Sequence, residues 1–197
     1  MSNAASLPVL LKELKLSGFA KAWESMSHKA IDEQWLPQDY LAMLCEQEVS
    51  DRYHKRVLRY TRDAQLPPGK NFSAFDFNAV KSVNKPQIEM LAKDSHWVQR
   101  AENVLFFGPS GMGKTHLASA IGYELIDKGL RVKFSTATAM VQMLQKARDE
   151  LVLVDALNRL DKYAVLILDD IGYVKKTELE TQVLFELIAQ YARLIWH

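Results

Sequence analysis

The chain has 197 residues, of which 48% are hydrophobic and 25% are charged, so a packed core is expected and global disorder is excluded. The net charge is only +1, so a nucleic-acid partner can be argued only from where the charge lies. Cys45 is the single cysteine, which excludes an internal disulfide and fits the cytoplasm. No apolar run approaches the roughly 20 residues that a membrane span needs.

The first part of the chain, residues 5–66, is expected to form a small all-helical domain. Four leucines recur at i, i+3, i+4 and i+7, which places them on one face of a helix: Leu7, Leu10, Leu11 and Leu14. Pro37 suits the first turn of a further helix that runs to about Arg62. The sequence Pro67-Pro68-Gly69 then ends the helix and begins a linker at residues 67–86.

Residues 87–197 alternate between short apolar runs and helical patterns, after a helix at about 86–93. Strands are expected at 103–107, 131–135 and 165–168, and helices at 114–128, 137–149, 155–162 and 178–192. Such alternation indicates an α/β domain whose parallel sheet is covered on both faces.

A phosphate-binding loop follows the first expected strand. The pattern G-x-x-x-x-G-K-[ST] is met by the run Gly108, Pro109, Ser110, Gly111, Met112, Gly113, Lys114 and Thr115. Its glycines let backbone N–H groups point at phosphate oxygens, and the helix that follows adds its positive N-terminal end. Lys114 is the expected contact to the β- and γ-phosphates, and Thr115 is an expected Mg²⁺ ligand. A glycine-rich turn without a ligand is the alternative.

Two acidic residues end the third expected strand. Ligands of open α/β sheets bind at the carboxyl ends of strands, so Asp169 is expected to hold Mg²⁺. Asp170 is the candidate that polarises an attacking water, and the acidic pair favours a water-splitting ATPase over a small-molecule kinase. The alternative is a solvated strand end.

A basic stripe lies near the end of the N-terminal helical region. Five Lys or Arg side chains fall within roughly a third of a helix circumference: Arg52, Lys55, Arg56, Arg59 and Arg62. A one-sided basic helix is typical of contact with a nucleic-acid backbone. A solvated face or an acidic partner is the alternative.

These features resemble the IstB-like ATPases, AAA+ helper proteins of insertion-sequence transposition that are related to the DnaC helicase loader. The resemblance covers nearly the whole chain and rests on these segments: residues 14–20, the basic segment 52–62, Phe75-Asp76-Phe77, the loop 108–115 with His116-Leu117-Ala118, 166–172 and 184–188. It implies binding of ATP and Mg²⁺, ATP hydrolysis, and ATP-dependent binding of double-stranded DNA. It also implies homo-oligomers and target selection with the transposase of the same element.

The resemblance implies a departure at the C-terminus. Family members continue with a sensor strand, expected between the strands at 103–107 and 165–168, and an arginine-bearing region. Here the chain stops at His197, so we expect an incomplete, truncated P-loop NTPase core with weakened ATPase activity. Two other functions stay open: a DnaC-like helicase loader, and a nucleotide-binding oligomerisation module without hydrolysis.

Overall fold

The computed structural model describes residues 6–80, 83–171, 181–182 and 187–188. The chain divides into two compact units, Met1–Leu58 and Arg59–His197, each described by itself below. The boundaries expected from the sequence, at 66–67 and 86–87, stay a prediction.

The first unit is helical. Helix α1 spans Leu7–Glu13, α2 spans Ser17–Asp32, and α3 spans Pro37–Ala64, so the last part of α3 belongs to the second unit. Pro37 begins α3, as its fixed φ and missing N–H favour. Leu11 and Leu44 are buried in this unit.

The start of α2 is held by α3. No side chain of its own caps α2, but the carboxylate of Glu48 accepts hydrogen bonds from the backbone N–H groups of Gly18 (2.5 Å) and Phe19 (3.2 Å). A Cβ at Gly18 would lie 2.7 Å from the Cα of Glu48, so only glycine fits this approach. A buried acid on one helix therefore caps the other.

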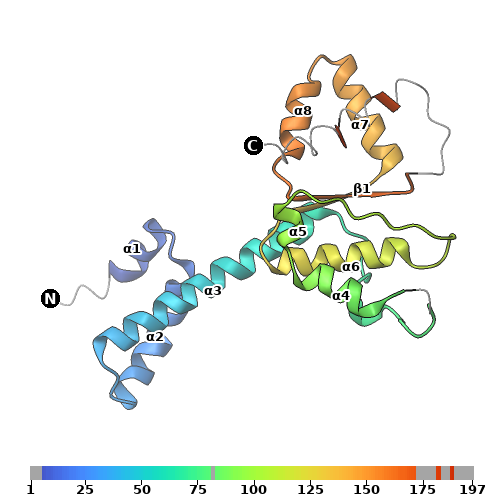
Figure 1. Cartoon of the computed structure of the whole chain (residues 1–197). Coiled ribbons are helices and arrows are strands. Elements are labelled where there is room, and N and C mark those ends of the chain that lie inside the picture. Colours follow the sequence, from blue (N-terminus) through green and yellow to red (C-terminus); the bar gives the residue numbers. More distant parts are fainter. Residues whose placement is uncertain (1–5, 81–82, 172–180, 183–186, 189–197) are drawn as a thin grey trace. The chain divides into compact units, whose positions relative to one another are not determined.

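The second unit is layered around a two-stranded parallel sheet. Strand β1 (Val132–Thr136) pairs with β2 (Val165–Asp169) in a register from Val132↔Val165 to Thr136↔Asp169. Figure 1 shows α4 (Lys85–Lys93) and α6 (Lys114–Asp127) on one face, and α7 (Ala137–Asp149) and α8 (Leu153–Leu160) on the other. The α/β class with a parallel sheet, and each of these four helices, is confirmed. The short η2 (Phe72–Ala74) and α5 (His96–Gln99) were not expected from the sequence.

The segment at residues 103–107 forms no strand, which corrects the sequence expectation. Leu105 is 67% exposed and Phe107 is 85% exposed, so the apolar run is not buried either. A strand needs a neighbour for its backbone N–H and C=O groups, and in the described parts of the chain only β1 and β2 pair.

Helix α6 carries the phosphate loop into the core. Its buried side chains include Leu117, Ile121 and Leu125. Gly122 lets α6 approach β2, because a Cβ there would lie 2.9 Å from Cδ1 of Ile167. The first turn of α6 is thereby set against the carboxyl end of β2.

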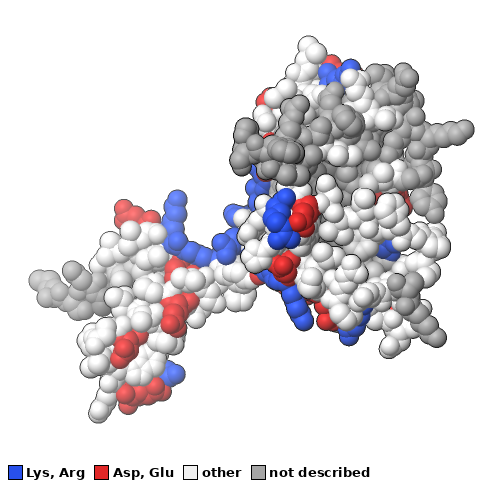
Figure 2. Space-filling view, viewed as in Figure 1, with Lys and Arg blue, Asp and Glu red and all other residues white. Residues whose placement is uncertain are grey.

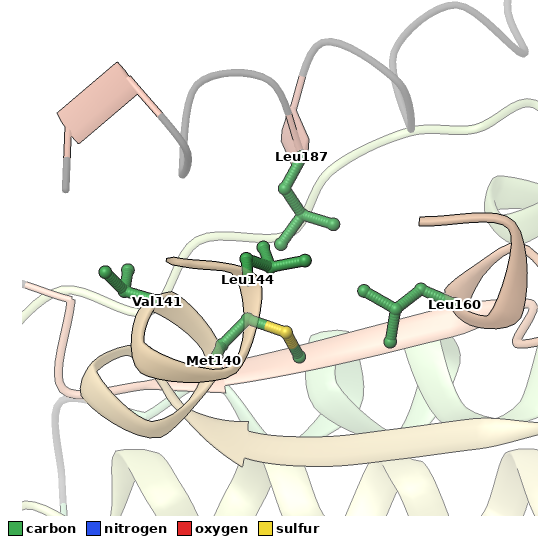
Figure 3. Packing of buried hydrophobic residues seen from close by; sticks show 5 residues of the cluster. All are labelled: Met140, Val141, Leu144, Leu160 and Leu187. Carbon is green, nitrogen blue, oxygen red and sulfur yellow. The ribbon is translucent and has the colours of Figure 1, made fainter. Parts of the chain in front are cut away.

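A compact apolar cluster fills the space between α7, α8 and the sheet. Figure 3 shows its five members, which are Met140, Val141, Leu144, Leu160 and Leu187. Leu187 belongs to the helix expected at 178–192, most of which lies outside the described residues. Leu144 is fully buried at the centre of this cluster.

We expect Leu144→Ala to lower the free energy of unfolding by about 2–5 kcal/mol, because the lost side chain leaves a cavity that its neighbours fill only in part. Urea unfolding measures this loss. Met143→Ala is the matched control, since Met143 lies on the same helix but is 40% exposed. Equal losses in the two variants would contradict the placement of Leu144 in the core.

Candidate functional site

A glycine within the phosphate loop directly precedes α6. Gly113 is the N-cap of the helix with φ +79°, a left-handed conformation that side chains disfavour. The first bond of the helix runs from the N–H of Leu117 to the carbonyl of Gly113. The N–H groups before Leu117 have no partner within the helix and can donate to an anion.

Lys114 lies folded over the loop. Its Nζ donates hydrogen bonds to the carbonyl oxygens of Gly108 (2.8 Å) and Pro109 (2.7 Å). These carbonyls hold the ammonium group beside the loop, where phosphate oxygens could replace them as acceptors.

Thr115 and Asp169 come together from positions 54 residues apart. The Thr115 hydroxyl donates to both carboxylate oxygens of Asp169, at 3.0 and 2.9 Å. Asp169 is the last residue of β2 and half-buried, as the sequence places it. A hydroxyl and a carboxylate are the oxygen ligands that Mg²⁺ uses when substrate phosphates and water complete its coordination.

This pair fits a metal shared with a ligand better than a metal held by protein alone. The described residues contain no group of three or more His, Cys, Asp or Glu side chains that could hold an ion. The hydroxyl of Thr115 and the carboxylate of Asp169 therefore fit Mg²⁺ together with a bound phosphate.

Asp170 directly follows β2 in an exposed position with φ +58°. Aspartate tolerates this left-handed conformation better than most residues, and such backbone strain is common at functional sites. Its role in activating water stays a prediction.

The structure divides the five residues of the basic stripe. Arg52 pairs with Glu48 (2.6 Å) and Lys55 with Asp51 (2.6 Å), both one helical turn apart on α3. The i, i+4 spacing of these acids and bases was a sequence signal for pairing within the helix.

All five members of the stripe are exposed, and the other three carry weaker contacts. Arg56 lies 5.4 Å from the ring centre of Tyr53, and Arg59 lies 5.5 Å from that of Tyr60. Arg62 approaches Asp63 at 3.5 Å. Figure 2 shows Lys and Arg side chains exposed on the surface of the chain.

Comparisons with known proteins give a family match. A family model described as "IstB-like ATP binding protein" matches residues 9–193. The chain belongs to the IstB-like ATP-binding family.

Curated relatives of this IstB-like chain are named as insertion-sequence ATP-binding proteins. One from Sinorhizobium fredii is 44% identical over 192 residues, which is 97% of this chain and 64% of the relative. The IS21 protein of Pseudomonas aeruginosa is 34% identical over 92% of this chain and 68% of its own length. The IS5376 protein of Geobacillus stearothermophilus is 35% identical over 90% and 70%. The chain thus spans about two thirds of the length of these relatives.

In the parts of this IstB-like chain that the structure describes, no helix is both long and apolar enough to span a membrane.

Two acids of α3 have pKa values that their hydrogen-bond partners lower. Burial opposes ionisation of Glu48, but hydrogen bonds from Arg52 and the backbone N–H groups of Gly18 and Phe19 outweigh it, so its pKa lies below the usual 4.5. Hydrogen bonds from Lys21, Lys55 and Ser17 hold the pKa of Asp51 far below its usual range.

A lowered pKa in the folded state means that ionised Glu48 stabilises the fold above pH 4.5, and that this stability is lost as the pH falls through the lowered pKa. We therefore expect Glu48→Gln to lose stability near neutral pH, and the difference from the wild type to shrink in acid. Urea unfolding over a pH series measures this difference. Glu46→Gln, on the exposed side of the same helix, is the control. A difference that stays constant with pH would contradict the assignment.

Proposed function

We propose that this chain binds Mg–ATP at the loop 108–115. The observation that carries the proposal is the contact of Thr115, within this loop, with Asp169, since these two residues are the expected Mg²⁺ ligands. Membership of an ATP-binding family supports ATP as the ligand.

Each part of the loop has a role in this proposal. The free N–H groups at the start of α6 bind phosphate oxygens, and Lys114 exchanges its loop carbonyls for the β- and γ-phosphates. Thr115 and Asp169 hold Mg²⁺, which when bound neutralises part of the phosphate charge.

ATP hydrolysis is proposed from the family resemblance and from Asp170. The carboxylate of Asp170 follows the Mg²⁺ ligand directly, and we assign it the task of orienting and polarising the attacking water. A module that binds ATP without hydrolysing it is the competing function, and phosphate release from a sample with proven ATP binding separates the two.

We further propose that ATP-dependent binding to double-stranded DNA serves target selection with the transposase of the same insertion sequence. The relatives named for insertion sequences support this role, as do the exposed side chains of Arg56, Arg59 and Arg62. Arg52 and Lys55 would join the contact only if DNA replaced their acidic partners. The proposal includes a cytoplasmic location, whereas homo-oligomers are proposed for full-length members of the family and not for this chain.

Lys114→Ala should abolish most ATP affinity and leave the fold intact, because an exposed loop loses one ammonium group and no core contact. Isothermal titration with Mg–ATP measures the affinity, and we expect a loss of at least about a hundredfold. Lys146→Ala is the control, since its side chain is 77% exposed on α7. Undiminished affinity in Lys114→Ala would refute the assignment of the loop.

The paired variant Arg56→Gln/Arg59→Gln should bind duplex DNA more weakly and with a shallower salt dependence, by up to about one unit of slope for each lost phosphate contact. Retention of DNA is measured across a salt series. The control variant Arg159→Gln/Lys162→Gln removes the same charge from two exposed positions, one in α8 and one just after it. This control should bind duplex DNA as the wild type does. If both paired variants bound duplex DNA as tightly as the wild type does, the helicase-loader function would be favoured instead.

A further inference from the structure

Helix α6 begins without a side-chain cap, so its first turn depends on contacts from elsewhere. One comes from the backbone of the linker, where the carbonyl oxygen of Asn71 lies 2.8 Å from Nε2 of His116. Asn71 is itself fixed, because its side chain caps η2 by accepting a hydrogen bond from the N–H of Ala74. The linker is thereby tied to the residue that follows the phosphate loop.

The second contact is made by the ring of Phe75. A Cβ built on Gly113 would lie 2.5 Å from Cε2 of Phe75, so the ring lies directly against this glycine. The same ring meets His116 edge-on with centroids 5.1 Å apart, and Phe77 with centroids 4.7 Å apart. Phe75 therefore touches the helix start on both sides of Lys114 and Thr115.

The contact of Phe75 with Gly113 bears on the direction of the N–H groups at the start of α6. Gly113 has the backbone freedom to leave its left-handed conformation, and such a change would redirect the N–H groups of Lys114 and Thr115. The ring of Phe75 occupies the place where a side chain on Gly113 would lie, so it packs directly against this glycine. Precise direction of these groups matters, since binding sites tolerate displacements of only about 0.5 Å.

We propose that Phe75 is a positioning residue of the nucleotide site, which holds Gly113 and His116 so that the start of α6 keeps its phosphate-binding geometry. The proposal rests on the nucleotide binding proposed above. Because the ring acts on the loop and not on the base, it should serve every ligand that carries the same phosphates.

The test compares Phe75→Leu with Phe72→Leu in the full chain. Phe72 belongs to the same linker, and its ring stacks on that of Phe77 with centroids 6.3 Å apart. The control therefore removes a ring from the same aromatic group. Titrations use two probes, Mg–ATP and magnesium with inorganic tripolyphosphate. We expect Phe75→Leu to weaken both by about tenfold and Phe72→Leu to weaken neither.

Amide hydrogen exchange without nucleotide gives a readout independent of ligand binding. We expect faster exchange over residues 113–117 in Phe75→Leu, and wild-type exchange there in Phe72→Leu. If the wild type binds neither probe, the proposed nucleotide function fails, and the exchange difference then shows only that the ring holds the start of α6.

Three results would overturn the proposal. A loss for Mg–ATP alone would assign the ring to the base. Equal losses in both variants would indicate general packing of the linker. Unchanged exchange over residues 113–117 in Phe75→Leu would show that the ring does not hold the helix start.

Discussion

The hydrogen bonds from the Thr115 hydroxyl to the Asp169 carboxylate join the first turn of α6 to the last residue of β2. This contact depends on the register of the sheet and on the packing of α6. The parallel register of β1 and β2 must place Asp169 at the carboxyl edge of the sheet, and α6 must pack closely enough on β2. Gly122 makes that packing possible. The candidate site is therefore a consequence of how one helix lies on one strand.

Local chemistry then determines what this junction can bind. The start of α6 offers N–H groups that have no partner within the helix. Lys114 adds an ammonium group, which donates hydrogen bonds to two carbonyl oxygens of the loop. Such a place favours anions with several oxygens, and the hydroxyl–carboxylate pair beside it favours a hard cation. A phosphate chain with Mg²⁺ combines both requirements, and the linker through Phe75 and Asn71 braces the helix start that receives it.

Much of the fold and the site could be predicted from local sequence. The helices at 114–128 and 137–149 and the strand at 165–168 carry strong periodicity or apolar runs, and the structure has them. The phosphate loop was identifiable because its spacing is strict. The apolar segment 103–107 was predicted to be a strand, and the structure has none there. Whether an apolar segment forms a strand depends on a neighbouring strand, which the local sequence does not reveal.

Other features depend on contacts between distant residues. The basic stripe predicted five equivalent cations, whereas Glu48 and Asp51 bind Arg52 and Lys55. The capping of α2 by Glu48 joins positions 30 residues apart, and no local pattern marks it. The contact of Phe75 with Gly113 likewise becomes visible only once the linker is folded onto α6.

A double-mutant cycle on Thr115 and Asp169 tests the shared Mg²⁺ site most directly. ATP affinity is measured with and without Mg²⁺ for Thr115→Val, Asp169→Asn and the double variant, with thermal unfolding as a check on the fold. If both side chains hold one ion, each single variant loses most of the affinity gained from Mg²⁺. The double variant then loses little more, which corresponds to a coupling of about 1 kcal/mol or greater. Simple addition of the two losses, or a Mg²⁺ dependence that neither variant changes, would contradict a shared metal site.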